Sequence, residues 1–158
     1  MDMKLDKKAL HAELMERLAE TLRALVEAHG ATIAGATHEE AKPENDKDTR
    51  ALEQQYLARG QAMRVEALKA GVSAASTMSL APVDSARVGA VIEAEDDEGQ
   101  TVRFFIAPEG GGLKLKSGAQ VLTPSSPLGA AMIGKREGDE FEVKMGPRSR
   151  TLTVLSIQ

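Results

Sequence analysis

Leucines recur every three or four positions near the start of the chain, and mostly charged residues fill the intervals between them. The leucines stand at Leu10, Leu14, Leu18, Leu22 and Leu25. An apolar residue at every third or fourth position places one apolar stripe along a charged helix. Ile33 continues the stripe, so we predict a first helix over residues 7–35.

A second helix is predicted to begin near a proline. Lys42 precedes Pro43 and is therefore pushed out of helical geometry, so the first helix must end before it. Pro43 suits the first turn of a new helix, and Asn45 is an alternative cap. One stripe of this helix is expected to carry Leu52, Tyr56, Met63 and Leu68, with Leu57 and Val65 beside it. Two such stripes must bury each other, which predicts an antiparallel helical hairpin, a short coiled coil, over residues 1–72.

The rest of the chain has a different pattern. Residues 73–86 are mostly small and polar and are predicted to form a linker. Short runs of β type follow at residues 87–95, 100–107, 113–116, 120–122, 140–145 and 150–157. Residues 126–133 begin with Ser-Pro and favour a short helix. We therefore predict an α+β protein, in which the hairpin precedes a small antiparallel sheet domain with one short helix over residues 87–158.

Acidic residues gather where the hairpin is expected to turn. Residues 38–48 contain Glu39, Glu40, Glu44, Asp46 and Asp48 against two lysines, Lys42 and Lys47. A turn at the end of a hairpin lies far from any core, so these carboxylates are expected to be exposed. Most acidic turns are only solvated surface, but exposed carboxylates at a tip can also be presented to a partner.

Composition and charge exclude several classes of protein. The chain has 158 residues, 42% of them apolar, and a net charge of -4. The charge is spread evenly, because residues 1–80 carry 11 basic and 13 acidic side chains and residues 81–158 carry 9 and 11. Neither half is therefore a counter-ion for nucleic acid. There is no cysteine, and no run approaches the about 18 apolar residues of a membrane span. We expect a cytoplasmic protein that does not contact a membrane.

Several short motifs at fixed spacings resemble those of one family. The motifs are Ser126-Pro127-Leu128-Gly129, Ile133-Gly134-Lys135 and Gly138-Asp139, with Glu44-Asn45 and Glu53-Gln54-Gln55 in the first half. Together they are similar to the Gre family of bacterial transcript-cleavage factors over nearly the whole chain.

This resemblance implies a fold, a partner and a role for several residues. The second half is expected to adopt the fold of FK506-binding proteins. The partner is RNA polymerase, and Ser126, Pro127, Leu128, Gly129 and Lys135 are the residues expected to dock on it. The hairpin would enter the secondary channel, where tip carboxylates help to hold the second Mg²⁺ of the polymerase. The polymerase then cleaves the 3′ end of a backtracked transcript.

The resemblance also implies what the factor does not do alone. It is expected to be a monomer that stimulates an activity of the polymerase and is not itself an enzyme. It is expected to bind no cofactor stably, and to contact the RNA 3′ end only within the polymerase complex. Its carboxylates need only lend oxygen ligands to Mg²⁺, which often takes one or two carboxylates from protein and keeps several waters.

Two positions depart from the family pattern. Glu44 matches the glutamate of the family's tip, but Ala41 stands where the family has an aspartate. We therefore predict that Glu44 and Glu40 form the acidic pair and the metal ligands. The alternative is a regulator that occupies the channel without stimulating cleavage. Ala130 replaces a residue that is usually basic in the family.

Other readings of the chain remain open. A domain of the FK506-binding type can be a prolyl isomerase or chaperone, but that chemistry needs an aromatic-lined pocket. The domain offers only Phe104, Phe105 and Phe141. Phe104 and Phe105 are adjacent in a predicted strand, so they should face opposite sides. A protein that uses this architecture to bind partners other than polymerase is a third possibility.

Overall fold

The computed structural model describes residues 4–40 and 46–158, and within them the side chains of residues 36–40, 46–48 and 145 are left out of the description. The chain forms two compact units. One unit combines Met1–Glu16 with Ala74–Gln158, and the other is Arg17–Ser73. Each unit is described below by itself.

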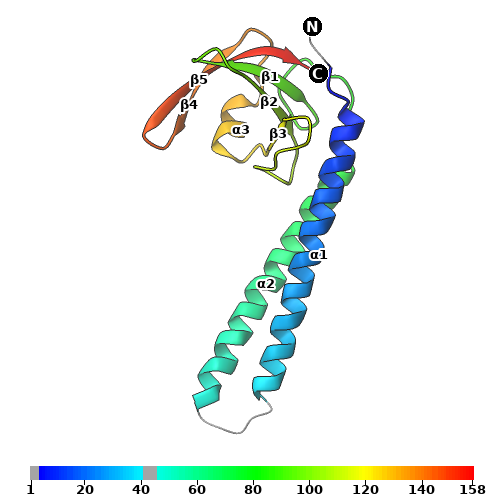
Figure 1. The fold of residues 1–158 in the computed structure, drawn as a ribbon, viewed down its shortest axis with the longest axis vertical. Helices are drawn as coiled ribbons and strands as arrows, with labels where there is room; N and C mark the ends of the chain where they lie inside the picture. The colour runs from blue at the N-terminus through cyan, green and yellow to red at the C-terminus, as the bar shows by residue number, and fades with distance from the viewer. Residues whose placement is uncertain (1–3, 41–45) are drawn as a thin grey trace. The chain divides into compact units, whose positions relative to one another are not determined.

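Two long helices build the unit Arg17–Ser73. Helix α1 spans Lys7–Glu40 and helix α2 spans Asp46–Ser76, and the two run side by side in opposite directions (Figure 1). The α1 face of the seam follows the predicted leucines: Leu18 is buried, and Leu22 and Leu25 are half-buried. The helical hairpin is therefore confirmed.

The stripe predicted for α2 is wrong at three of its four positions. Leu52, Tyr56 and Met63 are 48%, 61% and 69% exposed, whereas Leu68 is 9% exposed. Val65, which was placed beside the stripe, is also buried. The reason is geometrical, because Leu68 lies about 140° round the helix from Met63 at 3.6 residues per turn. Leu68 therefore belongs with Val65, three residues earlier, and not with Met63.

The helix ends also differ from the prediction. Helix α1 continues five residues beyond Gly35, to Glu40. Ile33 is 46% exposed, so it does not continue the buried stripe. Helix α2 begins at Asp46 and runs on to Ser76, into the stretch predicted as linker. The caps proposed at Pro43 and Asn45 lie outside the described residues.

A five-stranded sheet forms the centre of the other unit. The strands are β1 (Val91–Asp96), β2 (Thr101–Ile106), β3 (Gln120–Leu122), β4 (Glu140–Met145) and β5 (Arg148–Ile157), in the spatial order β3-β2-β1-β5-β4. The sheet curls around the short helix α3 (Pro127–Met132), as Figure 1 shows. An antiparallel-rich sheet with one short helix is what the sequence predicts.

Three details of the sheet differ from the prediction. Strand β1 begins at Val91 instead of residue 87, because Gly89 has φ +93° and packs against the carbonyl of Ser79. Strand β3 is parallel to β2, whereas every other pair is antiparallel. The predicted strand at 113–116 is reduced to a single bridge between Lys114 and Gln120.

The hairpin between β4 and β5 has a two-residue turn of Gly146 and Pro147. Gly146 has φ +66°, which is left-handed backbone that glycine adopts without a steric penalty. Glycine in the first turn position is typical of two-residue β-hairpins. Gly146 and Pro147 therefore form the turn that joins β4 to β5.

The apolar side of the sheet carries the main core. Large members that are at most 3% exposed are Phe104, Ile92, Ile106, Met132 and Leu152. Phe105 is fully buried but lies outside this cluster. The two phenylalanines therefore face opposite sides of β2, as predicted.

The first turns of α1 are held to the rest of their unit by side-chain contacts to backbone. Lys7 Nζ donates to the Ala81 carbonyl at 3.1 Å, and His11 Nε2 lies 2.8 Å from the Ala75 carbonyl oxygen. The Glu13 carboxylate accepts the Lys116 backbone N–H at 2.9 Å. Burial lowers the pKa of Lys7, and nearby Arg87 lowers it further. The start of α1 is thus part of the globular unit.

Among the residues that the structure describes, no helix is long and apolar enough to cross a membrane.

Candidate functional site

Helix α3 begins with a tightly bonded cap. Ser126 Oγ donates to the Thr123 carbonyl at 2.8 Å and accepts the Gly129 backbone N–H at 3.0 Å. Pro127 follows at the first helical position, where its missing N–H leaves no hydrogen bond unmade. These contacts fix the direction in which the helix leaves strand β3.

Space around Gly129 explains another residue of the Ser-Pro-Leu-Gly motif. A Cβ at this position would collide with the Thr123 carbonyl oxygen and crowd Ser126 Oγ. Ser126 and Gly129 therefore have local structural roles. Pro127 is exposed and Leu128 is half-buried, so these two residues are the members of the motif that a partner can reach.

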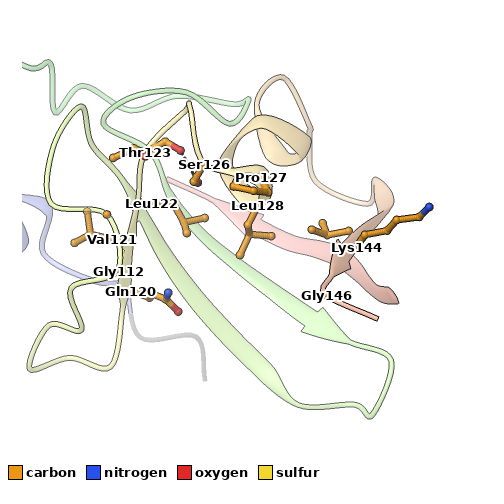
Figure 2. Close-up of a pocket in the computed structure, with 12 residues that line it drawn as sticks. Gly112, Gln120, Val121, Leu122, Thr123, Ser126, Pro127, Leu128, Lys144 and Gly146 are labelled. Atoms are coloured by element: carbon orange, nitrogen blue, oxygen red, sulfur yellow. Dashed lines mark hydrogen bonds between the residues drawn. The ribbon is translucent and has the colours of Figure 1, made fainter. Parts of the chain in front are cut away.

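Pro127 and Leu128 lie at a cavity of about 750 Å³, here called the docking cavity. Strand β3 forms one wall through Gln120, Val121 and Leu122, while Val143, Lys144 and Gly146 of the β4 hairpin lie on another side. Figure 2 shows Leu128 directed into the space between these elements. The lining is largely apolar, with the hydroxyls of Thr123 and Ser126 at its edge. Such a surface suits an apolar side chain of a protein partner.

No aromatic side chain lines the docking cavity among the residues described. Phe104, Phe105 and Phe141 are 3%, 0% and 8% exposed, so all three are taken up by the core. A prolyl ring therefore finds no aromatic wall there, which argues against isomerase chemistry.

Lys135 lies on another part of the unit and already has an intramolecular contact. Its Nζ is 6.0 Å from the centre of the Phe141 ring, within range of a cation–π interaction. Its carbonyl accepts the backbone N–H of Ala86 at 2.8 Å. Lys135 is thus half-buried, and does not line the docking cavity.

Asp96 forms a buried ion pair with Arg150, and neither residue was among the predicted site residues. Its carboxylate accepts the backbone N–H groups of Glu98 and Gln100 at 3.0 and 2.8 Å, and Arg150 Nη2 at 3.0 Å. The hydrogen bond from the Gln100 backbone does most to hold the pKa of Asp96 below its ordinary value, and the contacts with Arg150 and Glu98 lower this pKa further. Burial of the carboxylate acts in the opposite direction and raises the pKa. No local signal marks this pair, because the partners are 54 positions apart.

The structure does not describe the side chains of the acidic pair that the sequence predicts at the hairpin turn. Glu44 lies outside the described residues, and only the backbone of Glu40, at the end of α1, is described. Within the described part of the chain, no three histidine or carboxylate side chains are grouped to hold a metal ion. The roles of Glu44 and Glu40 stay predictions.

Residues 81–158, which contain the whole sheet and α3, match the family model described as "Transcription elongation factor, GreA/GreB, C-term". Through this domain the chain belongs to the GreA/GreB family of transcription elongation factors. The partner of such factors is RNA polymerase, and the factors are not themselves enzymes. No curated protein sequence matches the chain significantly.

Three solved structures are similar to most of the chain at low sequence identity. The Thermus thermophilus GreA factor homolog 1 (Gfh1) is 19% identical, with a TM-score of 0.40, over 91% of this chain and 94% of its own. Thermus aquaticus Gfh1 is 21% identical, with a TM-score of 0.41, over 90% and 92%. A further structure of the transcription factor Gfh1 is 19% identical, with a TM-score of 0.42, over 92% and 93%.

Proposed function

We propose that this elongation factor docks on RNA polymerase through the docking cavity and extends its helical hairpin into the secondary channel. The observation that carries the proposal is the Ser126–Gly129 motif of the matched domain. Ser126 and Gly129 are built into the α3 cap, whereas Pro127 and Leu128 remain accessible at an apolar cavity. Apolar, well-shaped contacts of this kind supply most of the energy at the centre of protein interfaces.

The acidic turn of the hairpin then has a function of its own. We assign to Glu44 and Glu40 the task of lending carboxylate oxygens to Mg²⁺ in the polymerase active centre. A second metal ion stabilises the attacking and leaving oxygens when a phosphodiester bond is hydrolysed. The chain would thereby stimulate cleavage of backtracked transcripts and act on the RNA 3′ end only inside the complex.

A second candidate is a factor that occupies the channel without stimulating cleavage. Ala41 favours it, because alanine stands where the family pattern has an aspartate and supplies no metal ligand. In this alternative the docking is the same, but the tip has one acidic ligand too few. The two candidates differ in the product that the polymerase releases.

A transcript-cleavage assay on a stalled, backtracked elongation complex separates the two candidates. The wild type is expected to shorten the RNA, and Glu44→Ala and Glu40→Ala are expected to lose that stimulation while still binding polymerase. Glu20→Ala removes an exposed carboxylate of α1 that lies outside the acidic stretch and the family motifs; it is the matched control and should behave as the wild type.

Each other outcome has a definite meaning. A wild type that binds polymerase but releases no shortened RNA is the channel-occupying regulator. A wild type that fails to bind polymerase at all, and instead retrieves other proteins, contradicts the docking proposal itself.

A further inference from the structure

The face of α2 that points away from its seam with α1 carries a row of exposed side chains. The row, here called the outer row, consists of Leu52, Tyr56, Arg59, Met63, Glu66 and Ala70. At 3.6 residues per turn its members fall within about 80° of one another, nearly opposite the buried Val65 and Leu68. Its three large apolar side chains are each at least 48% exposed. Helix α2 is therefore apolar on two opposite faces, and only one of them is covered by α1.

The spacing of the outer row is that of a coiled coil. Successive members are four, three, four, three and four residues apart. Alternating steps of four and three are the core positions of a heptad repeat, whose side chains pack into a second helix. The same large apolar residues were assigned to the hairpin seam in the sequence analysis, but α1 packs on the other face. The pattern thus calls for a further helix.

The outer row is complementary to itself when one copy is reversed. Reversal pairs Leu52 with Ala70, Tyr56 with Glu66, and Arg59 with Met63, because the members of each pair are equally far from position 61. A large side chain then faces a small one at each end of the row. Glu66 comes to lie beside Tyr56 and Arg59, which already contact each other, with the guanidinium carbon 5.9 Å from the ring centre. A parallel pair would instead place like charges together at positions 59 and 66.

We propose that the outer rows of two copies of this chain pack against each other as an antiparallel coiled coil, with the two-fold axis at the level of position 61. The Glu66 carboxylate of each copy accepts hydrogen bonds from the Tyr56 hydroxyl and the Arg59 guanidinium of the other copy. The Glu66 side chain is 74% exposed, and its contact with Lys69 at 3.5 Å leaves further lone pairs. A lipid surface suits the row less well, because Glu66 would meet negatively charged headgroups.

This contact does not depend on the docking cavity or on the acidic turn. It adds a second state to the monomer that the family resemblance implies. The dimer is expected to be weak and to exchange with the monomer, because each copy contributes only three large apolar side chains. If a single hairpin enters the secondary channel as proposed above, the dimer has to dissociate before the factor binds polymerase.

Sedimentation equilibrium of the full chain over a wide range of concentration gives the first test. The mass is expected to rise from 16.8 kDa towards twice that value. Arg59→Glu is expected to weaken the dimer about tenfold or more, because both symmetric contacts with Glu66 become repulsive. Adding Glu66→Arg to this variant restores opposite charges and should recover most of the dimer. Arg64→Glu is the matched control, because Arg64 is exposed on the same helix but lies about 120° from Leu52.

Disulfide formation tests the direction of the two helices, because the chain has no cysteine of its own. A mixture of Leu52→Cys and Ala70→Cys is expected to form a disulfide between the two variants, since these positions face each other in the antiparallel pair. Either variant alone should stay unlinked. A parallel pair would give the opposite result, because each variant would link to itself.

Three results would overturn the proposal. The first is the mass of a single chain at every concentration, and a Met63→Asp variant that then binds polymerase less tightly would assign the outer row to polymerase. The second is a double charge variant that dimerises no better than Arg59→Glu, or an equal loss in Arg64→Glu, which would mean general charge attraction. The third is a disulfide formed by Leu52→Cys or Ala70→Cys alone.

Discussion

At the scale of single residues, the Ser-Pro-Leu-Gly motif separates side chains that build the fold from side chains that remain accessible. Ser126 and Gly129 are fixed by the Thr123 carbonyl and by the α3 cap. Leu128 touches the core cluster and also lines the docking cavity. Substitutions at the first two residues should therefore change stability, whereas substitutions at Leu128 should mainly change binding.

Two glycine substitutions should change stability in opposite directions. Gly129→Ala is expected to lower the free energy of unfolding by about 1–3 kcal/mol, because the added methyl group meets the Thr123 carbonyl. Gly30→Ala is expected to raise helix stability by about 0.5–1 kcal/mol, because Gly30 lies in α1 with open space around it. Urea unfolding followed by circular dichroism checks both. A Gly129→Ala variant as stable as the wild type would contradict the packing.

The buried carboxylate of Asp96 should make stability depend on pH. Its folded-state pKa is lowered, so its contribution is complete above the ordinary aspartate pKa of about 4 and is lost as the pH falls through the lower folded value. Asp96→Asn is expected to unfold at lower urea concentration than the wild type at pH 6. The difference should shrink as the pH falls below the ordinary aspartate pKa of about 4. Asp97→Asn, an exposed neighbour in the same turn, is the control and should show no such convergence.

At the scale of elements, helix α1 could be predicted and the buried face of α2 could not. The α1 stripe is made of leucines, so its spacing gives the helix and its buried face together. The seam of α2 holds Ala58, Gln61, Val65 and Leu68, while larger apolar residues lie outside it. A seam of small and polar residues gives little hydrophobic signal. The exposed Leu52, Tyr56 and Met63 therefore led to the wrong face.

In the sheet, too, contacts between residues far apart in the sequence could not be predicted. Strands β2, β4 and β5 could be predicted because each alternates or runs apolar next to a turn signal. The parallel pairing of the three-residue strand β3 could not, because no local pattern specifies which neighbour so short a strand joins. The Asp96–Arg150 pair joins residues on β1 and β5 in the same way. This ion pair could therefore not be predicted from the sequence.

A comparison of two α2 variants tests which face forms the seam. Leu68→Ala is expected to cost about 2 kcal/mol of stability, because Leu68 is 9% exposed in the structure. Met63→Ala should change stability by no more than about 0.5 kcal/mol, because Met63 is 69% exposed. Thermal unfolding of the full chain measures both. Equal losses would mean that Met63 packs in the seam after all.

At the scale of the whole molecule, the two units carry separable parts of the proposed function. The unit with the sheet and α3 holds the docking cavity, and the acidic stretch of residues 38–48 is predicted to form the turn of the hairpin. Removing tip carboxylates should leave docking unchanged, and removing the docking contact should leave the tip chemically intact. A variant that binds polymerase without stimulating cleavage should then block the wild type.

Competition between variants tests this separation directly. An excess of Glu44→Ala is expected to reduce the cleavage that the wild type stimulates, because the variant occupies the same polymerase without supplying the metal ligand. The double variant Glu44→Ala with Leu128→Asp should not compete, because a carboxylate at position 128 cannot be buried in an apolar interface without a large desolvation penalty. Cleavage is measured on one stalled complex at a fixed amount of wild type and increasing competitor. If the double variant competes as well as Glu44→Ala, the polymerase does not bind at Leu128, and the docking surface must lie elsewhere on the chain.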